Sequence, residues 1–380
     1  MNEQQKIKTF LTTRNFNTID TGIELIRSLE NNQLFETLLK DIIIDQNGFI
    51  IRNKTFIGTG PAQPFLDYAL WKIISIAPQN ANIDKSIKIK NITHINMELS
   101  YHQKKDLPEK ICKYFTNLKI LILKNAKITD LNFLKNNKKL KTIFLEDCSD
   151  LKDISGIETF NLLNKLIIIN AKKIKNIDGM AKNIKYLNLT NCDSISNLNG
   201  LLDCSKLEEL ELIGFSETIE SNINSNSLKS FNGLKNCTEL KKIVYTDNNS
   251  EPYYPGYPLK NIDAIKNCKK LKFVILNKCH SVKNFDSILK LNNIKSLKIC
   301  NNKIKNLNFL QNCLKLEVLD IKGCIKIDNV DCIADLKNLT NLNMTGIKDP
   351  HPINKWATGN GKEYTNKKDV EKYQIRIKLK

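Results

Sequence analysis

Arginine is nearly absent from this sequence. The chain has 59 basic residues, but its arginines are only Arg14, Arg27, Arg52 and Arg376. Lysine therefore supplies almost all of the formal net charge of +19. A surface selected for phosphate usually contains arginine, because its planar guanidinium group makes paired hydrogen bonds to phosphate oxygens. The abundance of Lys, Asn and Ile favours drift toward A/T-rich codons, and a nucleic-acid or membrane binder is the alternative interpretation.

Long apolar segments are also missing. No apolar run approaches the roughly 20 residues that a membrane-spanning helix needs. The candidates around Ile42–Ile44 and Ile73–Ala77 are short, and no apolar core of a secretion signal follows the polar start Met1–Lys6. We therefore expect a cytoplasmic protein in a reducing compartment, without a membrane span. Its balance of 41% hydrophobic and 26% charged residues is typical of a folded protein and excludes wholesale disorder.

Residues that usually carry chemistry are few and scattered. The four histidines are His94, His102, His280 and His351. None of them belongs to a Ser/His/Asp or Cys/His arrangement of known spacing. Cys279-His280 has no CxxC pair or second histidine at the spacing of a zinc site, and Gly58-x-Gly60 lacks the rest of a phosphate loop. We predict that the protein is not an enzyme and has no catalytic residues, metal site or cofactor.

An internal repeat dominates the sequence. The pattern L-x-x-L-x-L begins ten times, at Leu118, Leu140, Leu163, Ile184, Leu207, Leu240, Leu271, Ile294, Leu316 and Leu339. A degenerate copy lies at Ile92–Met97. Within each unit a second motif follows, such as Leu131-Asn132-Phe133-Leu134, whose second residue is Asn, Asp or Ser. Such side chains accept backbone N–H bonds at helix starts, so each unit predicts a short strand, a turn and a capped helical turn.

This pattern resembles the leucine-rich repeat family. It is most similar to the short-repeat class of internalins and leucine-rich phosphatase regulators, with Cys often replacing Asn at the turn. The resemblance covers about residues 92–349. It implies an α/β fold: a right-handed solenoid with a parallel sheet on the concave side and short helical or 3-10 segments on the convex side. It names no partner, because proteins with this fold bind many different partners.

The eleven cysteines follow the repeat. One column comes directly after the strand and contains Cys148, Cys192, Cys279 and Cys324. A second column lies three residues before the next unit and contains Cys204, Cys237, Cys268 and Cys313. Cysteine exchanges there with apolar residues, as a small buried hydrophobe does. This favours structural thiols over metal ligands or disulfides.

The two ends of the chain do not repeat. We expect residues 1–91 to form a mainly helical N-terminal cap, residues 92–349 the solenoid, and residues 350–380 a C-terminal cap. An exposed end strand needs such covering. The predicted N-terminal elements are a helix or helix pair after Asp20 and Thr21, a strand or hairpin at Phe49–Phe56, and an apolar helix at Pro64–Ala77 containing Trp71. The predicted C-terminal element is a helix from about Asn366, with Val370, Tyr373 and Ile377 on one face.

Function is expected on the concave face, because a solenoid leaves that side of its parallel sheet open. Counting from the first Leu of each unit, positions 4 and 6 point inward and positions 3, 5, 7 and 8 point outward. The outward lysines are Lys124, Lys165, Lys242, Lys278, Lys298 and Lys322, and the outward acidic residues are Glu146, Asp147, Glu209, Glu211, Asp247 and Asp320. Since six charges balance six, this face offers no basic stripe for a duplex. Nucleic-acid or anionic-surface binding through Lys-rich edges is the alternative.

Apolar outward residues are unevenly distributed. One predicted patch contains Ile120, Ile122, Phe144, Ile167 and Ile169, extended by Tyr186, and a second contains Val244, Phe273 and Ile275. An even spread is expected if such residues merely suit strands, yet the last three units are mostly polar there. Two long units also carry inserts on one edge, near Ser216–Ser227 and at a segment with Tyr253, Tyr254 and Tyr257. We predict a scaffold for protein–protein interaction that binds an unknown protein partner through the concave sheet and this Tyr-rich loop. The alternative occupant of the patches is the chain's own N-terminal region.

Overall fold

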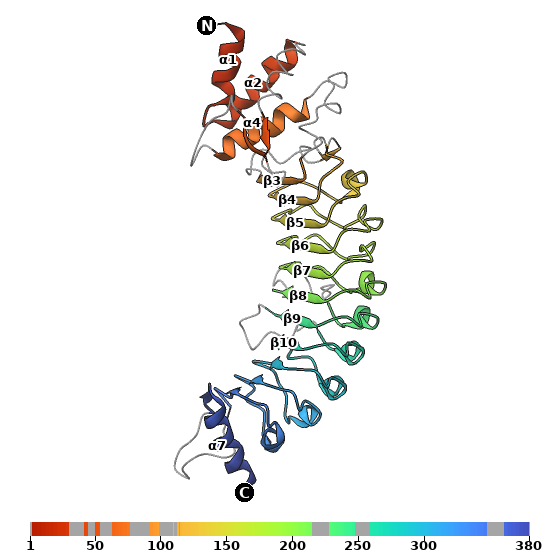
Figure 1. The fold of residues 1–380 in the computed structure, drawn as a ribbon, viewed down its shortest axis with the longest axis vertical. Coiled ribbons are helices and arrows are strands. Elements are labelled where there is room, and N and C mark those ends of the chain that lie inside the picture. Colours follow the sequence, from red (N-terminus) through yellow and green to blue (C-terminus); the bar gives the residue numbers. More distant parts are fainter. Residues whose placement is uncertain are drawn as a thin grey trace. The chain divides into compact units, whose positions relative to one another are not determined.

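The computed structural model describes most of the chain in two compact units. The described residues are 2–29, 42–44, 50–53, 63–76, 92–98, 109, 112–113, 115–214, 228–247, 259–347 and 361–379. The first unit comprises Met1–Leu151 and Ser155–Leu163, and the second comprises Lys152–Ile154 and Asn164–Lys380. Figure 1 shows both units and labels helices α1, α2, α4 and α7 and strands β3 to β10.

The first unit begins with two packed helices, α1 (Glu3–Leu11) and α2 (Phe16–Ser28). The side chain of Asn15 caps α2 by accepting the backbone N–H of Thr18. The predicted start after Asp20 and Thr21 was therefore too late, and α1 was not predicted. Gly22 is tolerated inside α2 because a methyl group there would lie 2.9 Å from the Cβ atom of Phe10, so glycine allows the close approach of α1.

The predicted strand within Phe49–Phe56 and the predicted apolar helix are present, but the strand's hairpin partner lies before the predicted range. Strands β1 (Ile42–Ile44) and β2 (Ile50–Asn53) pair antiparallel, and α4 spans Gln63–Ser75. The hydroxyl of Tyr68 on α4 donates to Asp20 Oδ1 at 2.7 Å. The Trp71 ring contacts Phe115, which lies in the degenerate unit before the repeat at Leu118, with the ring centroids 6.3 Å apart. Helix α4 therefore packs on the apolar interior of that degenerate unit.

Three parallel strands complete the first unit. They are β3 (His94–Glu98), β4 (Ile120–Lys124) and β5 (Thr142–Glu146), with the 3-10 helix η3 (Asn132–Leu134) between β4 and β5. The strands pair in the register that the repeat predicts, with Ile122 opposite Phe144. Burial alternates along β4 and β5, so positions 4 and 6 of each unit point into the core, as predicted.

The second unit continues the same pattern with eight parallel strands. They are β6 (Lys165–Ile169), β7 (Tyr186–Thr190), β8 (Glu209–Ile213), β9 (Lys242–Thr246), β10 (Phe273–Asn277), β11 (Ser296–Lys298), β12 (Val318–Asp320) and β13 (Asn341–Asn343). The 3-10 helices are η4 (Asn199–Leu201), η5 (Asn232–Leu234), η6 (Asp263–Asn267), η7 (Asp286–Lys290), η8 (Asn308–Leu310) and η9 (Asp331–Asp335). Strands line one side and 3-10 helices the other (Figure 1). The predicted solenoid is confirmed.

In nine of the ten repeats the turn after the strand contains a left-handed residue at position 8. Positive φ angles occur there at Asn125, Asp147, Asn170, Asn191, Lys278 and Asn301, and at Gly214, Gly323 and Gly346. Asn, Asp and Gly tolerate this conformation better than other residues. The reversal turns position 9 into the core, and in most repeats that position holds the small residues Cys, Ala or Asn.

The convex turns use a different cap from the predicted one. In seven repeats the second residue of the motif donates its own backbone N–H to an Asn or Asp side chain two positions earlier; the acceptors are Asp130, Asn176, Asn197, Asn261, Asn284, Asn306 and Asn329. This is an Asx turn. The prediction placed the accepting oxygen two residues too late.

Buried cysteines and asparagines donate to backbone carbonyls in the same columns. At position 9, Asn302 Nδ2 donates to Ile299 O at 2.7 Å, and Cys324 Sγ donates to the same oxygen at 2.9 Å. In the second column, Cys237 Sγ lies 3.6 Å from Leu201 O. All eleven cysteines are free thiols and nine are buried. Burial raises the pKa of Cys237 to about 12, so these thiols stay protonated and act as structural donors.

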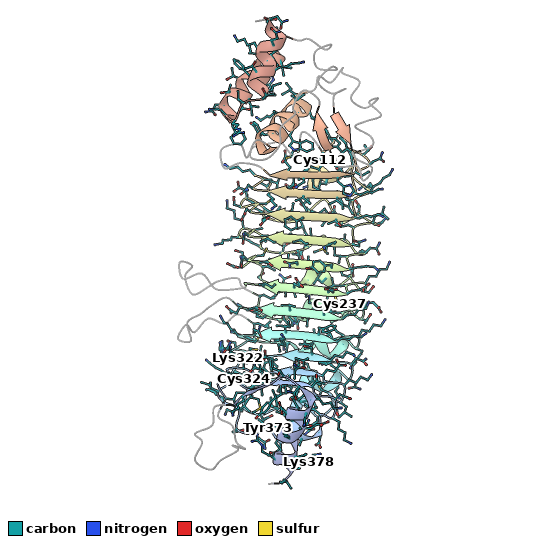
Figure 2. All side chains as sticks on the ribbon, turned by 60° about the vertical axis from the view of Figure 1, so that its left-hand side comes forward. Cys112, Cys237, Lys322, Cys324, Tyr373 and Lys378 are labelled. Atoms are coloured by element: carbon teal, nitrogen blue, oxygen red, sulfur yellow. The ribbon has the colours of Figure 1, made fainter. Side chains whose placement is uncertain are left out.

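The C-terminal end carries a strand and a helix. Strand β14 (Glu363–Tyr364) pairs antiparallel with β13, and α7 spans Lys367–Lys378. The predicted helix is confirmed: Asn366 caps it, and Val370, Tyr373 and Ile377 are buried. Gln374 Nε2 donates to the carbonyl oxygens of Ile333 and Leu336, both at the end of the repeat that begins at Leu316. Figure 2 labels Tyr373 within this packing.

Candidate interaction face

Side chains at positions 3, 5 and 7 form the face of the sheet opposite the buried core; we call it the open face. In the first unit, Ile120 and Ile122 on β4 and Phe144 on β5 lie on it and are half-buried. In the strand register, Ile122 lies between Asn96 on β3 and Phe144 on β5. Lys124 and Glu146 close the patch at the strand ends with an ion pair of 3.0 Å. The structure therefore brings together the three predicted residues of this unit.

In the second unit, Ile167 and Ile169 lie on the open face of β6 and are half-buried. Tyr186, on β7, was grouped with this apolar patch, but its environment is polar. The ammonium group of Lys165 lies 4.9 Å from the centre of the Tyr186 ring. The Tyr186 hydroxyl points toward β8, where it donates to Glu211 Oε2 at 2.9 Å.

Glu211 is the centre of a polar network across β7, β8 and β9. Besides the Tyr186 hydroxyl, it accepts Asn188 Nδ2 at 2.8 Å and Lys242 Nζ at 2.6 Å. Burial raises the pKa of this carboxyl group, but the bonds from Lys242, Tyr186 and Asn188 outweigh burial, and the net pKa is lowered. The sequence suggested only ordinary surface charge for Glu211. The available signal was its register, which places it between Asn188 and Val244.

The second predicted patch lies on β9 and β10. Phe273 is 46% exposed, an unusual exposure for a large apolar side chain on a strand. Ile275 is half-buried beside it on the same face. Val244 differs from its prediction, since only 8% of it is exposed. Its cross-strand neighbours Glu211 and Ile275 flank it. Val244 therefore lies between them and offers little accessible surface to a partner.

The open face becomes polar on β11, β12 and β13, as predicted. Its residues there include Ser296, Lys298, Asp320, Asn341 and Asn343. One charge in the predicted balance is misplaced, because Asp247 is 1% exposed and does not contribute to the accessible surface. The predicted contact residues Tyr253, Tyr254 and Tyr257 lie outside the described residues, as does the insert near Ser216–Ser227.

The fold is similar to that of solved structures. An internalin of Listeria monocytogenes is similar with a TM-score of 0.55 and 23% sequence identity, over 69% of each chain. The chain has the leucine-rich repeat fold. A leucine-rich repeat protein of Leptospira interrogans also matches, with a TM-score of 0.36 and 16% identity over 67% of this chain and 84% of that one. No family model and no curated protein matches the sequence.

The described part of this leucine-rich repeat chain contains no group of three His, Cys, Asp or Glu side chains able to hold a metal ion. At Cys279-His280, burial and the nearby Lys303 and Lys278 lower the pKa of His280 to about 4. Burial also raises the pKa of the Cys279 thiol. Among the described helices, none is long and apolar enough to cross a membrane.

Proposed function

We propose that this leucine-rich repeat chain is a non-catalytic protein-binding module whose partner docks on the open face. The observation that carries the proposal is the uncovered apolar surface there, above all Phe273 at 46% exposure. Parallel sheets usually have both faces covered, and aromatic side chains dominate the binding energy of many interfaces. Phe144 and Phe273 are accordingly the proposed anchors of their units.

The polar network supports a preformed binding surface. Glu211 receives three hydrogen bonds from its own chain. These side chains need no partner to satisfy them, so little ordering has to accompany binding. The partner would gain most from covering Ile167, Ile169, Phe273 and Ile275, on either side of this network.

The proposal extends to parts of the chain outside this face. Tyr253, Tyr254 and Tyr257 form a second contact region. Residues 1–91 and 350–380 cap the solenoid of residues 92–349, which the Trp71–Phe115 contact and the Gln374 hydrogen bonds support. We place the protein in the cytoplasm, since its free thiols suit a reducing compartment.

The test compares paired substitutions with a matched control. One variant carries Ile122→Asp and Phe144→Asp, and another carries Phe273→Asp and Ile275→Asp. The control carries Asn341→Asp and Asn343→Asp, which add the same two charges at positions 3 and 5 of a polar strand. Each purified chain is immobilised on resin and incubated with an extract of its source cells. The proteins that the resin retains are then quantified by mass spectrometry.

The expected result is a protein retained by the wild type and by the control. At least one apolar-patch variant should lose it by more than about tenfold, as removal of a hot spot predicts. Circular dichroism must show that the variants remain folded. Equal retention by all four folded chains would refute docking on the open face.

A further inference from the structure

A second surface lies at the edge where strands β10, β11 and β12 end. The three turns that follow them, residues 278–284, 299–306 and 321–329, contain a single acidic residue, Asp328, and six lysines: Lys278, Lys283, Lys303, Lys305, Lys322 and Lys326. Every one of these lysines except the half-buried Lys278 is exposed. Lys322 is labelled in Figure 2 on the side toward which the strand arrows point. We call these three turns the lysine edge.

The opposite edge also has lysines, but carboxylates neutralise many of them. Glu208 pairs with both Lys185 and Lys241. Lys270 pairs with Glu239 at 2.6 Å, and Lys295 pairs with Glu317 at 2.7 Å. On the lysine edge, by contrast, Lys283, Lys305, Lys322 and Lys326 make no ion pair with any residue of the described chain. The two edges therefore differ in accessible charge although both are rich in lysine.

The density of lysine differs from turn to turn: the turn after β6, residues 170–176, also holds three lysines and no acidic residue. The turn after β7, residues 191–197, contains Asp193 and no lysine. Drift toward A/T-rich codons would enrich every exposed turn alike, so it does not account for this contrast. Lys278 is also held at a φ of 57°, a strained conformation for lysine. The field of Lys303 and Lys278 reaches His280 and contributes to lowering its pKa.

An exposed apolar side chain lies within the basic cluster. Ile325 is 72% exposed and sits between Lys322 and Lys326 in the same turn. It occupies position 10 of its repeat, where the two preceding repeats have His280 and Lys303. Single-stranded nucleic acids are usually bound by aromatic or arginine side chains that stack on bases, and the lysine edge has no Arg, Phe, Tyr or Trp. Lysines around an isolated aliphatic side chain match an anionic lipid surface instead, where cations meet headgroups and the aliphatic group enters the interface.

We propose that the lysine edge binds an anionic lipid surface, with its lysines at the phosphate and carboxylate headgroups and Ile325 inserted at the boundary of the acyl chains. Each lysine close to such a surface contributes roughly fivefold to affinity. Binding is electrostatic and falls as salt screens the headgroups. Of the open face this contact uses only Lys322, at position 7 of its repeat, so the apolar residues of that face remain available to the protein partner.

The test is co-sedimentation of the full chain with vesicles. One set contains about 30% phosphatidylserine in phosphatidylcholine, and the other contains phosphatidylcholine alone, both at an ionic strength of about 0.1 M. We expect binding to the anionic vesicles only, weakened when salt is raised. Lys322→Glu with Lys326→Glu should reduce this binding more than about twentyfold, and Ile325→Ser about fivefold.

The matched control is Lys270→Glu with Lys295→Glu, which changes the net charge equally on the opposite edge. We expect it to reduce binding several times less than the lysine-edge pair does. Equal binding to the two kinds of vesicle, equal loss in the control, or no vesicle binding would overturn the proposal. A 20-base-pair duplex that binds while anionic vesicles do not, and is lost with Lys322→Glu and Lys326→Glu, would reassign the edge to nucleic acid.

Discussion

At the scale of single residues, position 8 of each repeat shows how backbone geometry selects the side chain. Six residues other than glycine have a positive φ at this position. Four of them are asparagine: Asn125, Asn170, Asn191 and Asn301. Asparagine enters the left-handed region at lower cost than other residues with a Cβ atom. Lys278 is the exception, with a φ of 57°. Its neighbours in the repeat array therefore impose a conformation that its own side chain disfavours.

Replacing Lys278 with asparagine is expected to stabilise the protein. The change relieves the left-handed strain, and the gain should be about 0.5–1 kcal/mol. Chemical denaturation monitored by circular dichroism measures it as a higher midpoint. Lys322→Asn, one position earlier in its own repeat, removes the same charge at a position without a positive φ. An equal or larger gain in that control would show that charge, and not backbone strain, is responsible.

Residue columns could be predicted where residue types exchange in an interpretable way. Cysteine alternates with leucine and phenylalanine in the column of Cys204, and burial of that thiol follows from the sequence alone. The Asx turns were missed, although Asn and Asp recur at Asp130, Asn176 and Asn197. The accepting residue and the second residue of the motif, two positions later, are both polar in most repeats. Only the backbone path shows which of the two side chains accepts an N–H group.

At the scale of elements, the strands were predictable because their period is short and repeats in phase. Helix α7 could also be predicted from the sequence, since Val370, Tyr373 and Ile377 have helical spacing. Helix α1 and strand β14 were missed. The α1 segment is polar on most of its surface, and its capping box at Asn2 is a weak signal in isolation. Strand β14 has two residues, and its pairing with β13 is a tertiary event that leaves no pattern in the sequence.

Helix α7 is expected to hold the end of the repeat that begins at Leu316 through Gln374. Gln374→Ala removes the donor to the buried carbonyl oxygens of Ile333 and Leu336. Both oxygens keep a backbone donor, so the loss of the two side-chain hydrogen bonds should lower the free energy of unfolding by about 1–3 kcal/mol. Hydrogen exchange should then accelerate first in residues 331–347. Gln311→Ala, at an exposed position after η8, is the control, and an unchanged exchange rate in the Gln374 variant would contradict the capping role.

The cysteine columns predict a steep loss of stability in alkali. Burial raises the pKa values of Cys204, Cys237 and Cys268 to about 12. Because the folded pKa lies above that of the unfolded thiol, the stabilisation is complete below about pH 8.5 and is lost as pH rises toward 12. Each buried thiol should contribute a loss of about 1.4 kcal/mol per pH unit in that window.

The check is chemical denaturation at several pH values between neutrality and about pH 10.5. The triple variant with Cys204→Ala, Cys237→Ala and Cys268→Ala should lose stability less steeply, by about 4 kcal/mol per pH unit, which is three times the single-thiol value. The comparison uses the slope against pH, so a lower starting stability of the variant does not affect it. Identical slopes would show that these thiols ionise as readily in the folded chain as in the unfolded one.

At the scale of the whole molecule, the sequence predicts which side chains share a face but not how exposed they are. Phe273 and Val244 both occupy outward positions, yet one is exposed and the other is buried. Their cross-strand neighbours differ: Val244 lies between Glu211 and Ile275, and Phe273 lies between Lys242 and Ser296. Tyr186 and Glu211 are 25 residues apart, and their hydrogen bond depends on the register of β7 with β8. The sequence alone also predicted balanced charge on the open face. The ion pairs that distinguish the lysine edge from the opposite edge could be seen only in the structure.

The most direct test of the central claim is site-specific photo-crosslinking on the open face. A photoreactive phenylalanine analogue replaces Phe273 in one chain, Asn341 on the polar part of the open face in a second, and the exposed Leu314 of a convex turn in a third. After irradiation in a cell extract, adducts are identified by mass spectrometry. The account predicts that one protein is joined at position 273 in large excess over positions 341 and 314. Equal crosslinking at position 314, or no protein adduct at position 273, would contradict it.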